Sequence, residues 1–234
     1  MSGAAFTTEF VPVQGALIAV SFKRSTRARR ISLRVDPAQG VVITLPMRAS
    51  RRAGLALLHE HEAWVSEKLD ALPLPLALKP GAMVPVVGVP HEIVHVQNQR
   101  GGAWIESGAI YVTGEPEFLA RRVSDCLKHL ARQRLTARAA ETAQRASLRP
   151  KVVRIKDTRS RWGSCAPDGT LAFCWRLICA PDFVQDYVVA HEVAHLRHMN
   201  HGPNFWALTD LLTPHRHAAT TWLANEGPSL LRIH

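Results

Sequence analysis

Two short segments match the pattern His-Glu-x-x-His, with which a helix can present two imidazoles and a carboxylate to one zinc ion: HEIVH at 91–95 and HEVAH at 191–195. On a helix, residues four apart share one face, with Cβ atoms about 5–6 Å apart. On a strand the same spacing separates the two histidines by roughly 13 Å. That is too far for one ion whose Zn–N bonds are about 2.0–2.1 Å. The local secondary structure therefore decides which copy can bind metal.

The first copy lies in a segment whose composition is typical of a strand. Residues 84–96 read VPVVGVPHEIVHV, which is rich in β-branched residues and is interrupted by two prolines and one glycine. No capping signal for a helix lies near His91. We therefore predict that HEIVH belongs to a strand and does not bind metal.

The second copy has the signals of a helix. Pro181 suits a first helical position, and Asp182 places an acidic residue in the first turn. The apolar residues that follow recur at intervals of three and four, as one buried helix face requires: Phe183, Val184, Tyr187, Val188, Val189, Val193, Ala194 and Leu196. His191 and His195 then point the same way, and Glu192 lies one step round the helix. We predict that these two histidines are metal ligands and that Glu192 is the catalytic carboxylate.

A catalytic zinc ion has three protein ligands and one open position, so a third ligand is required. His198 would stay on the same helical face, but one turn further along and not around the ion. His201 would lie about 80° from that face at about 100° per residue, so it can reach the metal only if the helix ends first. Asn200 and Gly202–Pro203 suit such an ending. We predict His201 as the third ligand and His198 as an imidazole that faces solvent or lies behind the ligands.

The spacing of HEVAH to His201 equals that of the metzincins, but His198 stands where metzincins have a glycine. This departure argues against a true metzincin. The alternative for the whole 191–201 cluster is a core helix whose histidines are satisfied by other partners. The helical context and the available third histidine favour a metal site.

Several further segments resemble the YgjP-like metallopeptidases, which are bacterial zincins with a metal motif similar to that of the Wss and SprT-like proteases that act near DNA. The strongest resemblance is carried by RWGSC at 161–165, WRLI at 175–178, YVVAHEVAHL at 187–196 and NHGPNFW at 200–206. Looser similarity in the N-terminal part extends it over most of the chain. The resemblance implies a zinc peptidase with ligands His191, His195 and His201 and with Glu192 as the catalytic carboxylate.

Composition sets the limits of the fold. The 234 residues, of which 47% are hydrophobic, are enough for one large domain or two small ones with a sizeable core. The first ten residues lack the basic and apolar regions of a signal peptide, and no run approaches the roughly 18 apolar residues of a membrane span. We expect a soluble, cytoplasmic protein without membrane association. The cysteines form no CxxC pair and are expected to be free thiols: Cys126, Cys165, Cys174 and Cys179.

The predicted fold class is α+β. We expect a β-rich N-terminal part with one helix (1–80), a short-strand region (81–115) and a compact zincin-like part (116–234), in which a small sheet and C-terminal helices pack around the HExxH helix. We find no internal repeat in the sequence. The predicted strands are 16–23, 29–36, 40–46, 83–87, 92–97, 102–106, 109–113, 151–156 and 170–176. Besides the metal helix, we predict a helix of about 20 residues capped by Ser50, a long helix at 116–147, and two final helices near 205–206 and 220–222.

These residues predict a zinc-dependent peptidase that acts on proteins or peptides. Three neutral imidazoles leave zinc electrophilic, so that a bound water can reach a pKa near ~7. Glu192 would take the proton from this water and deliver it to the leaving amine. The RWGSC segment is too polar to serve packing alone, so Arg161 and Trp162 are candidates for the substrate cleft, together with His198. Trp162 can alternatively plug the core.

Positive charge is concentrated in one segment. Residues 121–161 contain thirteen Lys or Arg against three acidic residues, a local excess that equals the net charge of +10 of the whole chain. Such a basic segment can follow a phosphate backbone or recognise acidic proteins. The alternative function is therefore a nucleic-acid-associated protease or a nucleic-acid-binding zincin-fold module. The simpler reading is a solvated helix face, because no binding motif with interleaved aromatic residues accompanies the charge.

Overall fold

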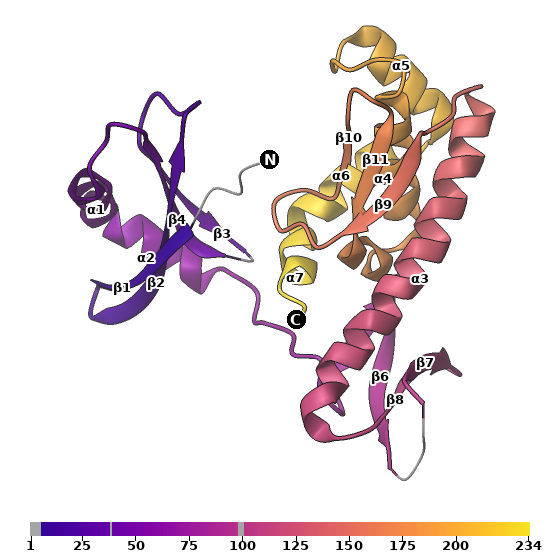
Figure 1. Cartoon of the computed structure of the whole chain (residues 1–234), viewed down its shortest axis with the longest axis horizontal. Coiled ribbons are helices and arrows are strands. Elements are labelled where there is room, and N and C mark those ends of the chain that lie inside the picture. The colour runs from indigo at the N-terminus through magenta and orange to yellow at the C-terminus, as the bar shows by residue number, and fades with distance from the viewer. Residues whose placement is uncertain (1–5, 38, 98–100) are drawn as a thin grey trace. The chain divides into compact units, whose positions relative to one another are not determined.

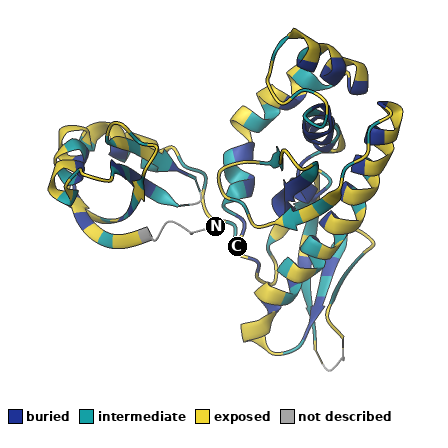
Figure 2. Cartoon of the chain, turned by 45° about the horizontal axis from the view of Figure 1, so that its top comes forward, coloured by how far each residue is buried: buried dark blue, intermediate teal, exposed yellow. Residues whose placement is uncertain are grey.

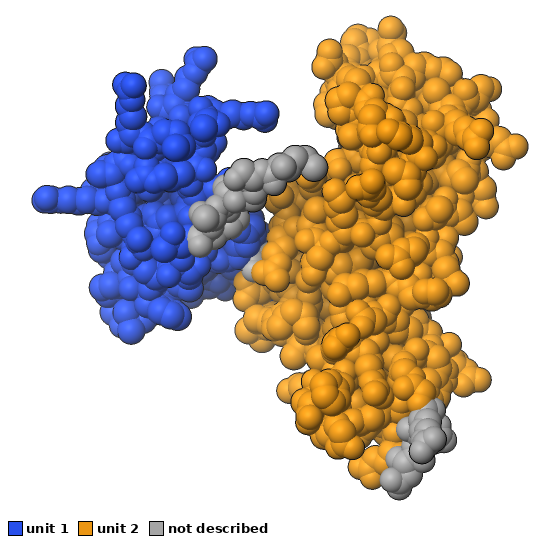
Figure 3. Space-filling model, in the orientation of Figure 1, with its two compact units in different colours: residues 1–73 blue, residues 74–234 orange. Residues whose placement is uncertain are grey.

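The structure is a computed structural model that describes residues 6–37, 39–97 and 101–234. The chain forms two compact units, residues 1–73 and 74–234 (Figure 3). Each unit combines strands with helices (Figure 1). The predicted α+β class is confirmed. In the described part of the chain, no helix combines the length and the apolar character needed to cross a bilayer.

The first unit contains a four-stranded sheet in the order β1-β2-β4-β3. Its two outer pairs are antiparallel, and the central strands β2 and β4 run parallel. Strand β1 was not predicted, because apolar and polar residues do not alternate along it. Phe10 is apolar but 73% exposed, whereas the buried residues on the other face are Val11 and Val13. The strands are β1 (Phe6–Val13), β2 (Ala16–Ser25), β3 (Ser32–Asp36) and β4 (Gly40–Pro46).

The helix predicted after Ser50 forms, but it is divided at His61 into α1 (Arg51–Glu60) and α2 (Glu62–Asp70). The Ser50 hydroxyl accepts a hydrogen bond from the Ala53 backbone N–H at 3.1 Å, as an N-cap does. The helices bury Leu58 and Val65 completely in the core of this unit.

The second unit begins with a sheet of the same topology, in the order β5-β6-β8-β7. Its outer pairs are again antiparallel and its central pair parallel. The first hairpin of each sheet carries the same pattern, VPVQG at 11–15 and VPVVG at 84–88, and each turn has two consecutive residues with positive φ. The expectation of no internal repeat is therefore wrong at the level of topology. The strands are β5 (Met83–Val86), β6 (Val89–Val96), β7 (Ala103–Glu106) and β8 (Ala109–Thr113).

The long helix α3 (Pro116–Arg145) confirms the predicted helix and spans the second unit (Figure 1). It buries a row of residues spaced by four: Leu119, Val123, Leu127, Ala131, Leu135, Ala139 and Ala143. The row changes from leucine and valine to mostly alanine toward the C-terminus, and small side chains allow a neighbouring helix to pack closely. The opposite side of α3 is largely exposed (Figure 2).

A three-stranded sheet and a buried helix form the remainder of the second unit. The sheet has the order β10-β11-β9, with β10 antiparallel and β9 parallel to β11. The predicted strand 170–176 ends earlier, at Cys174, and the chain continues as a 3₁₀ helix. Strand β10 and the last short helix were not predicted. The elements are β9 (Val152–Lys156), β10 (Gly163–Cys165), β11 (Thr170–Cys174), η1 (Trp175–Cys179), α4 (Asp182–Ala194), α5 (Pro203–Leu212), α6 (Arg216–Asn225) and α7 (Gly227–Leu231).

The C-terminus of the chain is tied to the start of the second unit. Leu76 and Ile233 form a parallel bridge, and the Leu78 N–H donates to the carbonyl of His234 at 2.9 Å. The buried Arg176 donates from Nε to the Ile233 carbonyl at 3.0 Å. All four cysteines are free thiols, as predicted.

Candidate metal centre

Three imidazoles converge at the end of α4. His191 lies in the last turn of this helix, and His195 is the residue at which the helix ends. The chain then turns and reaches His201 shortly before α5 begins at Pro203. The ring centroids are 5.0 Å apart for His191 and His195, 5.0 Å for His191 and His201, and 4.7 Å for His195 and His201. Helix α4 thus ends early enough for the chain to bring the His201 ring beside the other two, as predicted.

The geometry of the triad fits a metal ion. One ring nitrogen from each histidine lies within 4.8 Å of the other two, and the Nε2 atoms of His191 and His201 are 3.1 Å apart. Two nitrogens at about 2.0–2.1 Å from one tetrahedral ion would lie roughly 3.3–3.4 Å apart. Among the residues that the structure describes, no other group of three or more His, Cys, Asp or Glu side chains comes together in this way.

The ring orientation of His195 is held by the backbone. Its Nδ1 lies 3.0 Å from the carbonyl oxygen of His198. Because a carbonyl only accepts, Nδ1 carries the proton and Nε2 keeps its lone pair for a metal. His198 therefore acts through its main chain, and its imidazole is not part of the triad. The Nδ1 of His191 is buried and has no hydrogen-bond partner in the described part of the chain.

Burial favours the neutral form of two of the three imidazoles, those of His191 and His195. It lowers the pKa of His191 to about 4, and the charges of His195 and His201 act in the same direction. Burial also lowers the pKa of His195, against the opposing effect of its hydrogen bond to His198. Since an imidazole must be deprotonated to bind a metal, these shifts favour a metal site at neutral pH.

Aromatic residues enclose the triad. The ring of Phe205, which is fully buried, lies 4.9, 4.5 and 4.6 Å from those of His191, His195 and His201. Trp206 stacks on His201 with ring centroids 5.6 Å apart. The sequence did not predict either residue as part of the site. Apolar residues at the start of a helix give the same sequence pattern whether they line a site or pack in a core.

Glu192 lies one residue after His191 and is only 6% exposed. Burial raises its pKa to about 7, against the opposing charge of the Arg161 guanidinium. A carboxyl group with a pKa near the working pH can both accept and return a proton. A buried carboxyl group that can take up and release a proton thus lies beside the histidine triad.

The three candidates for the substrate cleft have different surroundings. Arg161 is exposed and acts electrostatically on Glu192. Trp162 is half-buried against the core, and its carbonyl accepts a hydrogen bond from the Cys174 N–H at 2.8 Å. His198 lines a shallow hollow of about 320 Å³ beside the start of α5. A contact between any of them and substrate stays a prediction.

The other HExxH segment lies in β6, which confirms the predicted strand. Nδ1 of His91 lies 2.7 Å from the Val89 carbonyl, and Nε2 of His95 lies 2.8 Å from the Gly114 carbonyl. The two imidazoles thus have separate backbone partners.

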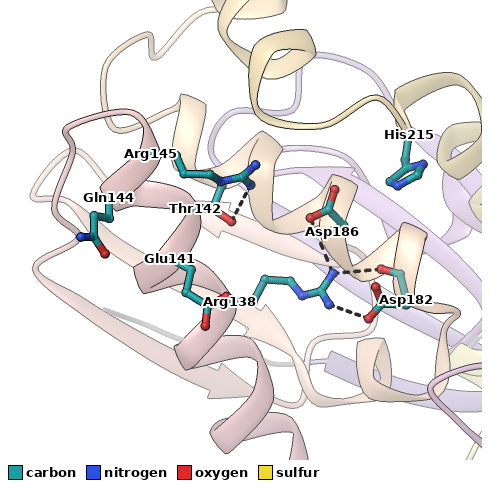
Figure 4. A pocket seen from close by; sticks show the side chains of 8 residues that line it. All are labelled: Arg138, Glu141, Thr142, Gln144, Arg145, Asp182, Asp186 and His215. Atoms are coloured by element: carbon teal, nitrogen blue, oxygen red, sulfur yellow. Dashed lines mark hydrogen bonds and ion pairs between the residues drawn. The ribbon is translucent and has the colours of Figure 1, made fainter.

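Much of the basic segment 121–161 is engaged within the protein. Arg138 lies between two carboxylates of α4, with Nη2 2.5 Å from Asp182 and Nη1 3.6 Å from Asp186 (Figure 4). Arg134 also contacts Asp182. Further ion pairs join Arg121 and Lys128 to Asp125 and Lys151 to Asp168. The contacts of Arg134 and Arg138 join α3 to α4. All of these ion pairs reduce the positive charge available to a partner, and nucleic-acid binding stays a prediction.

A histidine triad with an adjacent buried carboxylate is the arrangement of metal-dependent hydrolases. The chain belongs to the YgjP-like family, because the model of the YgjP-like metallopeptidase domain matches residues 29–226. This membership assigns a general function as a metallopeptidase and implies a metal ion. The comparisons with curated proteins and with solved structures found no match.

Proposed function

We propose that the protein is a zinc-dependent peptidase in which His191, His195 and His201 hold the ion and Glu192 serves as general base and then as general acid. One observation carries this proposal: three ring nitrogens converge within 4.8 Å of one another, next to the carboxyl group of Glu192, which lies on the same helix as His191. In the described part of the chain, no fourth His, Cys, Asp or Glu side chain joins the three histidines, and three protein ligands with one open position are typical of a catalytic zinc site and not of a structural one.

Zinc bound by the triad would supply a Lewis acid for the peptide carbonyl and would lower the pKa of a water molecule. Glu192 is suited to hold the proton that this water loses, because the pKa of its carboxyl group is about 7. The same carboxyl group can then donate the proton to the leaving amine. His201 is exposed, so an extended peptide can approach the triad from solvent.

The proposed substrates are proteins or peptides. Arg161 is exposed and acts on Glu192, so we assign it a contact with the substrate near the cleaved bond. Trp162 holds the same loop against the core, and the turn after α4 brings the His198 carbonyl to the His195 ring. We assign both the loop and the turn to the substrate cleft.

The proposal is tested with purified protein loaded with zinc. Zinc per chain is measured by elemental analysis, and hydrolysis is measured with casein as an unfolded protein substrate. The wild type and the control variant His91→Ala should carry about one zinc per chain and be active. Glu192→Gln should keep zinc and lose activity by about 10²–10⁴-fold, whereas His201→Ala should lose zinc. Full activity in Glu192→Gln would refute the assigned base, and stoichiometric zinc in His201→Ala would refute the third ligand.

A further inference from the structure

Gly163 faces Glu192 from the neighbouring strand. It is the first residue of β10 and pairs with Phe173 of β11. Strand β10 packs against α4, the helix that carries Glu192. The glycine of the RWGSC segment is thereby brought beside the catalytic carboxyl group from a position 29 residues earlier in the chain.

The space beside Gly163 is filled by the Glu192 side chain. A Cβ atom added at Gly163 would lie 2.5 Å from Oε1, 2.6 Å from Cγ and 2.8 Å from Cδ of Glu192. Carbon atoms in contact prefer separations of about 3.5–4.0 Å. Gly163 has no positive φ, so the position requires glycine for its lack of a side chain and not for its backbone conformation.

Neither of the two elements can move away easily. In α4, the residues Val189 and Val193 are fully buried, which fixes the helix in the core. The loop before β10 is held where the Trp162 carbonyl accepts a hydrogen bond from the Cys174 N–H. The conflict also begins at Cγ, near the base of the Glu192 side chain, so turning the carboxylate tip alone would not relieve it. A side chain at position 163 would therefore displace Glu192.

We propose that Gly163 is a positioning residue: its missing side chain leaves the space in which the carboxyl group of Glu192 is held beside the histidine triad. The steric part of this inference stands on the structure alone, and its catalytic consequence rests on the proposed function. It gives the glycine of RWGSC a specific role that is distinct from a contact with substrate.

The steric part is tested by thermal unfolding of the metal-free protein in a double-mutant cycle of Gly163→Ala and Glu192→Ala. In the wild-type background, Gly163→Ala should lower Tm by roughly 2–10 °C, as overpacking does. In the Glu192→Ala background the same change should cost almost nothing, because Cγ, Cδ and both carboxylate oxygens are gone. The control is Gly102→Ala, since a Cβ at Gly102 would meet no atom within 4 Å. An equal loss in both backgrounds, or no loss in either, would overturn the inference.

The catalytic part is tested with zinc-loaded protein. Gly163→Ala should keep its zinc and its KM, while kcat falls by about 10–100-fold, because a displacement of about 1 Å can reduce a rate by this much. Gly102→Ala should retain the wild-type kcat. If the wild type is active and Gly163→Ala has an unchanged kcat, the positioning role is refuted. If the wild type hydrolyses no peptide, the proposed function fails, and the unfolding cycle still decides whether Gly163 makes room for Glu192.

Discussion

The Nδ1 atom of His195 lies 3.0 Å from the backbone carbonyl oxygen of His198. This contact assigns the proton of the His195 ring to Nδ1 and leaves Nε2 free to bind a metal. His198 has no positive φ, so its backbone conformation does not require the glycine that metzincins have at this position. The turn uses the main chain of this residue and not its side chain.

We therefore predict that His198→Ala keeps the metal. The variant retains the carbonyl that orients His195, so its zinc content and zinc affinity should stay within about threefold of the wild type. Removal of a group that does orient a ligand typically costs about 10–100-fold in metal affinity. Zinc affinity is measured by competition with a chromogenic chelator. A loss as large as that of His201→Ala would show that the His198 imidazole itself binds the ion.

Glu192 should make the stability of the metal-free protein depend on pH. In the folded state its pKa of about 7 lies above the ordinary value of 4.5, because burial disfavours the charged form. Its contribution to stability is complete below about pH 4.5 and is lost as the pH rises through about 7. Glutamine does not titrate, so Glu192→Gln should gain stability over the wild type between pH 5 and pH 8, on the order of 3 kcal/mol.

This gain is measured by urea unfolding of both proteins at the two pH values. Other titrating groups are common to both proteins and cancel in the comparison. A stability difference that is the same at pH 5 and pH 8 would contradict the raised pKa of Glu192.

The pairing of α3 with α4 should contribute to the stability of the second unit. Arg138 is only 19% exposed and contacts both Asp182 and Asp186 of α4. Arg138→Ala would leave these carboxylates without one of their cations, and we expect a loss of about 1–3 kcal/mol in urea unfolding. The matched control is Arg132→Ala on the exposed side of the same helix, which should change stability by less than about 0.5 kcal/mol. Equal effects of the two variants would contradict this role.

Cys165 should react slowly in the folded protein. Burial raises the pKa of its thiol to about 11, and the negative charges of Glu192 and Asp168 act in the same direction. The thiolate is the reactive form, so alkylation by iodoacetamide at pH 8 should be on the order of 100-fold slower than in the denatured chain. Peptide mass spectrometry after timed quenching measures the rate. Equal rates in the folded and denatured states would contradict the raised pKa.

Several features of the protein were predictable because they depend on neighbours in the chain. The β-branched residues around HEIVH predicted a strand, and that segment forms β6. The three- and four-residue periodicity before HEVAH predicted a helix, and that segment forms α4. The short spacing to His201 limited where a third imidazole could come from. Local backbone conformation places these groups, so local patterns were sufficient.

Other features depend on segments that meet only after folding. Sequence reasoning found no repeat, whereas strand pairing shows that the two sheets share one topology. Phe205 lies against all three imidazoles only because α5 folds back onto the end of α4.

By itself, the sequence determined which HExxH copy is helical, the α+β class and the candidate set of one carboxylate and three imidazoles. The tertiary structure alone decided that the three rings converge, that Arg138 pairs with carboxylates of α4, and that Gly163 leaves room for Glu192. The physical reason is that hydrogen bonding within a helix acts over four residues. Burial, ion pairing and steric exclusion instead depend on which distant segments pack together, and a linear pattern does not specify that packing.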